Sequence, residues 1–313
     1  MFPTLELLTE VLSSLFAARG RQFDVVGRKP NPYSSTFPSE IVTCKSPDGQ
    51  IMRLLCKYSG DASHESYGHR GDVAYEALVY HHILQAVDAE IPEFYGSHQD
   101  PENDGTWLVL EYIGNSQPLN KKPEALIDAA RWIGRFHATG ERMRHLLSVP
   151  LLKRFDRDYY MGWAQRTMLL GGPLHDEFPW LTNFCERFGE LSTALLTPAP
   201  TIIHGEYYPR NILVRDDTLY PIDWESAAQA VGEIDLASLT EGWEPNIVEQ
   251  CKREYARCRW PQGAPDHFED ALSAAKAYWC LRWLGEHAYW NRRKPAFSRC
   301  RELRRISRQW GVC

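Results

Sequence analysis

Residues 202–225 carry three oxygen-bearing side chains whose spacing suits metal binding and acid–base chemistry: Glu206, Asn211 and Asp223. Between Asn211 and Asp223, two short apolar runs flank a polar turn, a pattern that predicts a hairpin. Such a hairpin brings Asn211 and Asp223 together at its open end. One carboxylate and one amide oxygen can share a hard divalent cation such as Mg²⁺. The carboxylate of Glu206 then remains to accept a proton from, or to orient, an attacking hydroxyl group.

The order of residues in this stretch resembles the catalytic loop of a known superfamily. The pattern His-Gly-x-x-x-Pro-x-Asn, followed by Ile-Asp-Trp-Glu, is similar to that of the aminoglycoside phosphotransferase and choline kinase family, a branch of the protein-kinase-like superfamily. The resemblance implies that Asn211 and Asp223 hold Mg²⁺ and that Glu206 acts on the acceptor hydroxyl. An ordinary hairpin with a solvated turn is the alternative interpretation, and the agreement of several spacings weighs against it.

One residue departs from the family pattern, because the family usually has aspartate at the position of Glu206. The extra methylene of glutamate moves the carboxylate by about 1.5 Å, the length of one carbon–carbon bond. A displacement of this size can cost a large factor in rate unless the backbone compensates. A nucleotide-binding pseudokinase, with a regulatory role and no phosphotransfer, is therefore an alternative function. A nucleotidyl transferase on the same fold is another.

The composition indicates a globular protein long enough to bury a sizeable core, with 313 residues of which 43% are hydrophobic and 24% charged. The net charge of −6 argues against a nucleic-acid binder held by phosphate contacts. The eight cysteines include no Cys-x-x-Cys pair, which argues against zinc and favours reduced thiols. With no apolar run of membrane-spanning length and no signal peptide, we expect a cytoplasmic monomer or homodimer without membrane contact.

A lysine and a glutamate in the first hundred residues are predicted to form an ion pair. Lys57 ends a predicted apolar strand, and Glu76 lies in the first turn of a helix predicted at 73–87, with Asp72 as its N-cap. By the resemblance, Lys57 grips the nucleotide phosphates and Glu76 fixes it, with Glu65 a weaker candidate partner. A solvated lysine and a glutamate that merely favours the helix dipole are the alternatives.

Two connecting segments are further candidates for nucleotide binding. Segment 28–39 contains no glycine, but Ser34 and Ser35 can donate hydrogen bonds to phosphate oxygens. A surface loop rich in proline and serine is an equal alternative. The run Leu-Val-Leu-Glu-Tyr-Ile-Gly is similar to the kinase hinge. That resemblance implies that the Glu111 carbonyl and the Ile113 amide bind the base, and an ordinary core strand is the alternative.

His204 and Asp235 are predicted to stabilise the loop that carries Glu206 rather than to transfer protons. His204 precedes the glutamate, and Asp235 lies in segment 231–239, which resembles a second motif of the family. We expect both to hold the loop through hydrogen bonds. Arg210, next to the predicted metal ligand, is a candidate contact for a phosphate group or an acidic substrate.

The second half of the chain is predicted to be mainly helical. Helices are expected at 159–170, 175–186, 188–196 and from 268 to about 290. Trp279 and Trp283 are four residues apart and share a helix face, so they can wall a substrate pocket that holds a cation. Packing in the core is the more frequent reason for this spacing. The basic run from Arg292 to Arg308 fits a solvated helix face.

These patterns predict an α+β protein with a two-lobed, protein-kinase-like fold. An N-lobe at 1–112 is expected to hold an N-terminal helix, an antiparallel sheet and one further helix. The strands of this sheet are expected at 22–26, 40–44, 51–58, 94–97 and 107–112. A helical C-lobe at 113–313 is expected to carry the catalytic loop and the acceptor pocket. The resemblance implies a small-molecule kinase that uses ATP or GTP with Mg²⁺ and phosphorylates an aminoglycoside-like compound, another natural product, a sugar or an amino alcohol.

Overall fold

The computed structural model describes residues 2–33, 36–60, 67–100, 105–147 and 152–312. The chain divides into two compact units. The N-terminal unit comprises Met1–Lys122 and Arg210–Ser226, and the C-terminal unit comprises Pro123–Pro209 and Ala227–Cys313. The hairpin that carries Asn211 and Asp223 is therefore part of the N-terminal unit, although it follows the first long helices of the C-terminal unit in sequence.

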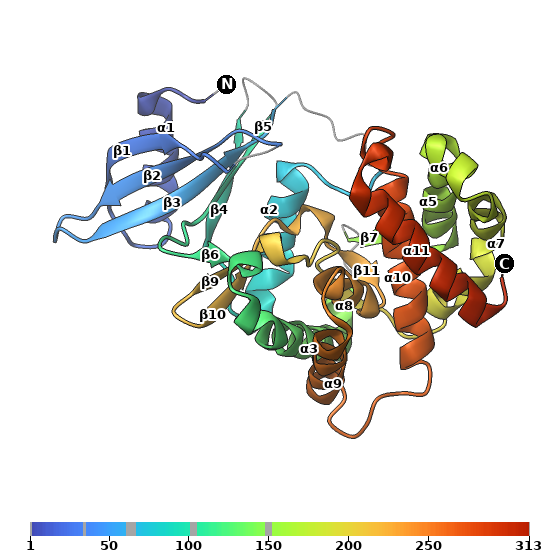
Figure 1. Cartoon of the computed structure of the whole chain (residues 1–313). Coiled ribbons are helices and arrows are strands. Elements are labelled where there is room, and N and C mark those ends of the chain that lie inside the picture. The colour runs from blue at the N-terminus through green and yellow to red at the C-terminus, as the bar shows by residue number, and fades with distance from the viewer. Residues whose placement is uncertain (1, 34–35, 61–66, 101–104, 148–151, 313) are drawn as a thin grey trace. The chain divides into compact units, whose positions relative to one another are not determined.

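The N-terminal unit contains a five-stranded antiparallel sheet with the strand order β1-β2-β3-β5-β4 (Figure 1). The strands are β1 (Asp24–Pro30), β2 (Ser39–Lys45), β3 (Ile51–Tyr58), β4 (Phe94–Asp100) and β5 (Gly105–Glu111). All five predicted strands are present. Strand β1 starts two residues later than predicted and extends to Pro30, so it includes the start of the segment predicted as a loop.

One face of this sheet is covered by α1 (Leu5–Ala17), whose N-cap Thr4 accepts a hydrogen bond from the Leu7 amide. Leu8, Leu12 and Phe16 of this helix belong to one buried apolar cluster with Leu54 and Cys56 of β3. Because side chains alternate between the two faces of a strand, Lys57 lies on the face opposite to that of Cys56.

The second helix of this unit, α2 (Val73–His82), begins as predicted, because Asp72 Oδ1 accepts from the Tyr75 amide at 2.8 Å. It ends earlier than predicted. Ile83 is its C-cap, and a single 3₁₀ turn, η1 (Leu84–Ala86), follows. The two histidines that close α2 have low helix propensity, which favours this early end.

The predicted hairpin is formed by β9 (Ile212–Arg215) and β10 (Thr218–Pro221). Its two-residue turn places Asp216 and Asp217 at φ 48° and 63°, the left-handed values that a tight hairpin requires. Strand β6 (Gln117–Pro118) pairs with the other edge of β9. The segment that leaves β5 is therefore joined to the hairpin by a β-ladder within the N-terminal unit.

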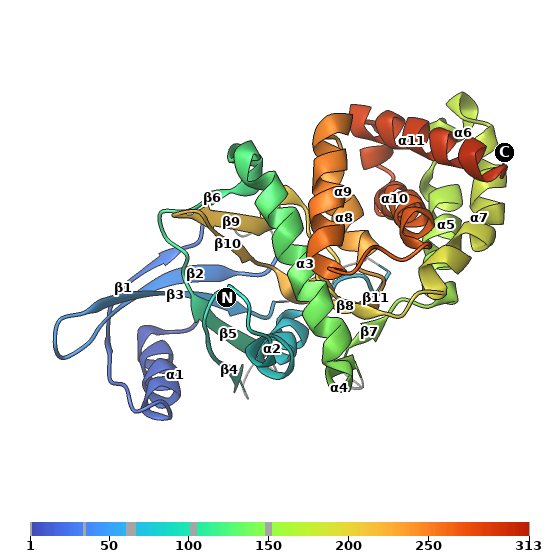
Figure 2. The same ribbon diagram turned by 90° about the horizontal axis from the view of Figure 1, so that it is seen from below.

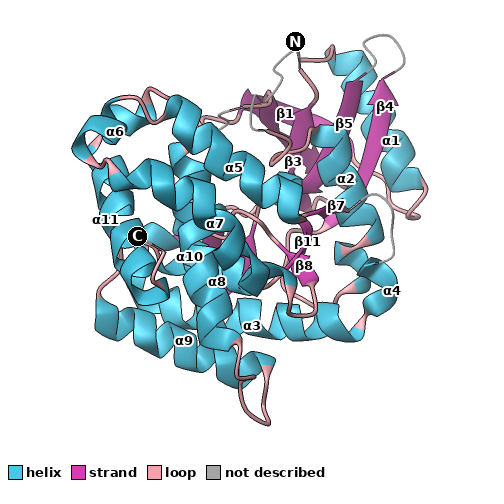
Figure 3. Ribbon diagram, turned by 90° about the vertical axis from the view of Figure 1, so that its right-hand side faces the viewer, coloured by secondary structure: helices cyan, strands magenta, loops and turns pink. Residues whose placement is uncertain are grey.

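The C-terminal unit is mainly helical and contains one small sheet with the order β7-β11-β8. Its helices are α3 (Leu126–Arg142), α4 (Arg144–Leu147), α5 (Arg157–Leu170), α6 (Pro173–Glu177), α7 (Trp180–Leu196), α8 (Glu233–Thr240), α9 (Pro245–Arg259), α10 (Phe268–Leu284) and α11 (Lys294–Trp310). Its strands are β7 (Lys153–Arg154), β8 (Thr201–Ile203) and β11 (Ala228–Ala230). Helix α3 packs along α9 (Figure 2), and α10 packs against α5 and α7 (Figure 3).

Three helix predictions in this unit were wrong in their bounds. The segments predicted at 175–186 and 188–196 are instead a short α6 and one continuous α7, because the backbone leaves helical geometry at Phe178, just before Pro179, and α7 continues through Gly189. The helix predicted to reach about 290 ends at Leu284, where Gly285 follows as C-cap. No helix of the described residues has the length and apolar character needed to cross a membrane.

Candidate active site

A cluster of three carboxylates surrounds Lys57 in the N-terminal unit. The Nζ atom of Lys57 lies 2.6 Å from Glu76 Oε2, 3.2 Å from Glu225 Oε2 and 3.5 Å from Asp223 Oδ1. Burial on its own lowers the pKa of Lys57, but the nearby carboxylates outweigh it and raise this pKa well above its ordinary value. The lysine is therefore a permanent cation. We refer to Lys57, Glu76, Asp223 and Glu225 as the lysine cluster.

Helix α2 and the segment after β10 are tied together within the lysine cluster. The Glu76 Oε1 atom accepts from the Trp224 amide at 3.1 Å while Glu76 Oε2 faces Lys57. The Gly71 amide, just before α2, donates to the Glu225 carbonyl at 2.6 Å. These bonds fix the backbone that follows Asp223, so the ion pair predicted between Lys57 and Glu76 also orients that aspartate.

The two predicted metal ligands lie at the open end of the hairpin. The Asn211 carbonyl accepts from the Ile222 amide at 2.9 Å, which pairs the residues that precede β9 and follow β10. Asp223 is held at φ 61°, a left-handed conformation that non-glycine residues rarely adopt. Its side chain is 49% exposed, whereas Asn211 is 7% exposed.

These residues fit a Mg²⁺ ion, because a half-exposed carboxylate and a neighbouring amide supply the hard oxygen donors that this ion prefers. In the part of the chain that the structure describes, no group of three or more His, Cys, Asp or Glu side chains is arranged to hold a metal. A Mg²⁺ ion bound by Asn211 and Asp223 would thus complete its coordination with water and phosphate oxygens.

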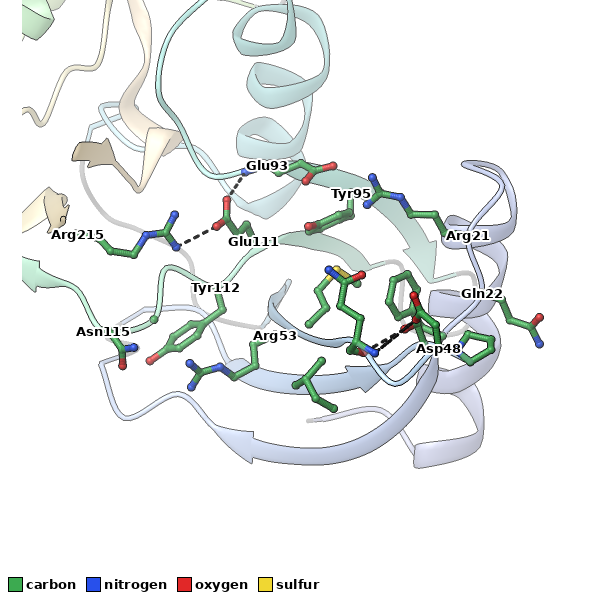
Figure 4. Close-up of a pocket in the computed structure, with 17 residues that line it drawn as sticks. Arg21, Gln22, Asp48, Arg53, Glu93, Tyr95, Glu111, Tyr112, Asn115 and Arg215 are labelled. Carbon is green, nitrogen blue, oxygen red and sulfur yellow. Dashed lines mark hydrogen bonds and ion pairs between the residues drawn. The ribbon is translucent and has the colours of Figure 1, made fainter. Parts of the chain in front are cut away.

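The segment that resembles the kinase hinge includes Glu111, the last residue of β5. An ion pair links Glu111 to the hairpin. Arg215 Nη1, on β9, lies 3.2 Å from Glu111 Oε1. Both residues line a hollow of about 900 Å³ in the N-terminal unit, together with Arg53 and Tyr112 (Figure 4). Neither Lys57 nor Asp223 lines this hollow, which is therefore separate from the lysine cluster.

The structure describes two of the remaining residues predicted to contact nucleotide or phosphate, Ile113 and Arg210. The Ile113 carbonyl accepts a hydrogen bond from Ser116 Oγ at 2.6 Å. The binding of the base by the Ile113 amide stays a prediction. Ser34, Ser35 and Glu65 lie outside the described residues. Arg210 is exposed, and its contact with a phosphate or an acidic substrate stays a prediction.

In the C-terminal unit, the carboxylate of Glu206 is bound by an arginine. Glu206 is 2% exposed, and its Oε1 atom accepts a hydrogen bond from Nη2 of Arg282, which is fully buried in α10. The same Nη2 atom lies 3.6 Å from Glu286 Oε2. The departure from aspartate at position 206 is thus accompanied by a buried cation.

The backbone before Glu206 is held by Asp235, on α8. This fully buried aspartate accepts from the His204 amide at 2.7 Å and from the Gly205 amide at 2.9 Å. The His204 Nδ1 atom accepts a hydrogen bond from the Glu206 amide, two residues later, at 3.3 Å. Asp235 and His204 therefore stabilise the loop through hydrogen bonds to its backbone.

A second histidine extends this set of hydrogen bonds. His137 Nε2, on α3, lies 3.1 Å from Asp235 Oδ2, and His137 Nδ1 lies 3.0 Å from the Tyr255 hydroxyl. Burial lowers the pKa of His137 and outweighs the raising effect of Asp235. The imidazole is therefore neutral at pH 7, donates from Nε2 to Asp235 and accepts at Nδ1 from Tyr255.

Trp279 and Trp283 share a face of α10, as predicted, but the cation beside them belongs to the chain itself. The Arg282 guanidinium carbon lies 5.4 Å from the Trp279 ring centroid and 4.5 Å from that of Trp283. Trp279 is buried and donates from Nε1 to Glu241 Oε2 at 3.0 Å. Their role in a substrate pocket stays a prediction.

Residues 64–266, more than half of the chain, match the model of the phosphotransferase enzyme family. The chain belongs to this family. No curated protein sequence matches it significantly. The family membership confirms the resemblance drawn from the catalytic-loop pattern.

Solved structures of kinases share the fold of this phosphotransferase. A GDP complex of an aminoglycoside 2′-phosphotransferase is 12% identical, with 98% of both chains covered and a TM-score of 0.63. The choline kinase of Streptococcus pneumoniae is 14% identical, with 97% and 98% covered and a TM-score of 0.59. A fructosamine-3-kinase from Haemophilus somnus is 15% identical, with 96% of both chains covered and a TM-score of 0.57. The protein-kinase-like fold, with a five-stranded N-terminal sheet and a mostly helical C-terminal portion, is thus confirmed.

Two residues of the candidate site were missed from sequence. Glu225 stands two residues after Asp223, within the Ile-Asp-Trp-Glu motif, and its spacing alone was a usable signal. Arg282 follows Trp279 by three residues on one helix face, so its place beside the rings was predictable. Its bond to Glu206, across 76 residues of sequence, was not.

Proposed function

We propose that this phosphotransferase transfers the γ-phosphoryl group of ATP or GTP to a hydroxyl group of a small molecule. The observation that carries the proposal is the lysine cluster, in which one cation meets three carboxylates and one of these, Asp223, is half exposed. Such a site offers a solvent-exposed carboxylate for a metal and a lysine for phosphate oxygens. Phosphoryl transfer asks chiefly for these elements.

The proposed roles fall to the residues predicted from the sequence. Lys57, fixed by Glu76, binds the nucleotide phosphates, and Asn211 and Asp223 hold Mg²⁺. When bound, Mg²⁺ neutralises charge on the phosphate oxygens. Glu206 accepts a hydrogen bond from the acceptor hydroxyl and orients it for attack, or takes its proton. The Glu111 carbonyl and the Ile113 amide bind the base.

Similar structures support the choice of nucleotide and guide the choice of acceptor. One is a GDP complex and another is an AMP complex. The kinases among them act on aminoglycosides, choline, fructosamine and macrolides, as their names state. A panel of these compounds, with ATP and GTP as donors, therefore covers the acceptor classes that we propose.

The test is Mg²⁺-dependent turnover of this panel by the wild type and by Asp223→Asn. We expect Asp223→Asn to lower turnover by about 1000-fold, the scale for losing one preorganised charge-stabilising group. Asp216→Asn is the matched control, because Asp216 also has a positive φ and lies in the same hairpin. Full activity of Asp223→Asn would overturn the metal assignment, and release of pyrophosphate instead of ADP or GDP would identify a nucleotidyl transferase.

A further inference from the structure

Arg282, which binds Glu206, has few polar partners for a buried arginine. Arg282 is fully buried, yet its Nε and Nη1 atoms make no hydrogen bond within the described residues. Its bond from Nη2 to Glu206 and the longer approach to Glu286 are its polar contacts. Glu206 is therefore the main partner that compensates the buried charge of Arg282.

Aromatic rings fix the arginine in place. Arg282 lies on α10 between Trp279, three residues before it, and Trp283, directly after it, with its guanidinium against both rings. Cation–π contacts of this kind gain strength when they are shielded from water. The Trp279 ring is in turn held by its hydrogen bond to Glu241. Arg282 is thus a cation of fixed position rather than a mobile surface side chain.

Glu206 needs such a partner more than a shorter side chain would. A glutamate has one more rotatable bond than an aspartate, and ordering long side chains costs conformational entropy. Burying its carboxylate without a cation costs several kcal/mol. A charge-assisted hydrogen bond to one oxygen meets both demands, since it supplies a countercharge and fixes the rotamer.

We propose that Arg282 is a positioning residue that clamps one oxygen of Glu206, so that the other orients the acceptor hydroxyl. The inference rests on the proposed function and deepens it. Arg282 acts on the reaction only through Glu206, and it contributes nothing to nucleotide binding by Lys57, Asn211 and Asp223. The pair therefore controls turnover rather than nucleotide affinity.

The experiment compares Arg282→Gln and Arg282→Lys with the wild type, in steady-state kinetics with Mg²⁺·ATP or Mg²⁺·GTP. Choline is the hydroxylated probe, and water is the second acceptor, followed as nucleotide hydrolysis. We expect Arg282→Gln to lower kcat roughly 100-fold, the scale for a misplacement of about 1 Å, with an unchanged KM for nucleotide. Arg282→Lys keeps the charge and should recover part of this loss.

Arg299→Gln is the control, because the Arg299 guanidinium lies 4.8 Å from the Trp283 ring centroid but pairs with Glu241 instead of Glu206. It should keep the kcat of the wild type. Thermal unfolding of each variant verifies that it is folded. If Arg282→Gln does not fold, Arg282→Lys carries the test alone, with a lowered kcat and an unchanged KM as the expected result.

A double-mutant cycle isolates the path of the effect. Because Arg282 acts through Glu206, adding Arg282→Gln to Glu206→Gln should cause no further loss of kcat. A further loss, or an unchanged kcat in Arg282→Gln alone, would overturn the inference while the proposed function stands. If wild type and Asp223→Asn are equally inactive with every acceptor, the proposed function fails and this inference fails with it.

Discussion

The lysine cluster and the pair of Glu206 with Arg282 differ in how far their carboxylates are exposed to solvent. In the first, one cation faces three carboxylates, and one of these is half exposed. In the second, a buried carboxylate meets a fully buried cation beside two tryptophan rings. One region presents a carboxylate to solvent, and in the other both charged groups are buried.

The difference separates two requirements that a phosphotransferase has to meet. A site that binds a metal and a charged nucleotide must keep charge available, because a balanced, buried cluster has no attraction left for either. A group that orients a hydroxyl must instead be held in one rotamer, for which a single buried partner suffices. Removing a charge should therefore weaken nucleotide binding when it is done in the lysine cluster. In the C-terminal unit it should lower the free energy of unfolding.

The largest effect is expected for Asp235→Asn, in the C-terminal unit. Asp235 is fully buried and accepts from two amides and from His137. Its replacement removes the charge and turns one acceptor into a donor that faces other donors. We expect the free energy of unfolding to fall by about 3 kcal/mol, measured by urea denaturation. Asp128→Asn, at an exposed ion pair with Arg131, is the control and should change it little.

A smaller effect, on binding rather than stability, is expected for Glu76→Gln in the lysine cluster. Lys57 keeps Asp223 and Glu225 as partners, so the fold should persist. The lysine loses its shortest ion pair, and we expect nucleotide affinity to weaken about tenfold, which corresponds to about 1.4 kcal/mol. Titration calorimetry with ATP or GTP and Mg²⁺ measures this. Equal loss of stability in Glu76→Gln and Asp235→Asn would erase the contrast between the regions.

The smallest effect concerns pH. Burial lowers the pKa of His137 below its ordinary value of 6.5. Well above pH 6.5 the residue is neutral in both the folded and the unfolded state and adds no pH dependence. As the pH falls below 6.5, the unfolded chain takes up the proton first, so the free energy of unfolding decreases. His137→Gln should remove this part of the decrease, measured by urea denaturation between pH 7 and 5. An identical pH dependence in the variant would show that His137 does not titrate as its burial implies.

Sequence was most informative where chemistry depends on local spacing. The hairpin, its two candidate ligands and the pairing of Lys57 with Glu76 follow from short-range patterns and from one family resemblance. Element bounds failed where a single residue decides, as at Ile83 and Pro179. The bond of Arg282 to Glu206 was out of reach, because helical periodicity gives the face of a residue but not its partner on a distant loop.

The discontinuity of the N-terminal unit has a consequence for the order of synthesis. Proteins emerge from the ribosome from the N-terminus, and units fold once their residues are available. Residues 1–122 emerge first, but the hairpin of Arg210–Ser226 follows only after much of the other unit has been made. Until then Glu76 is the available carboxylate of the cluster for Lys57, and β9 is missing from its ladder with β6. The unit that comes first in the sequence is thus completed late in translation.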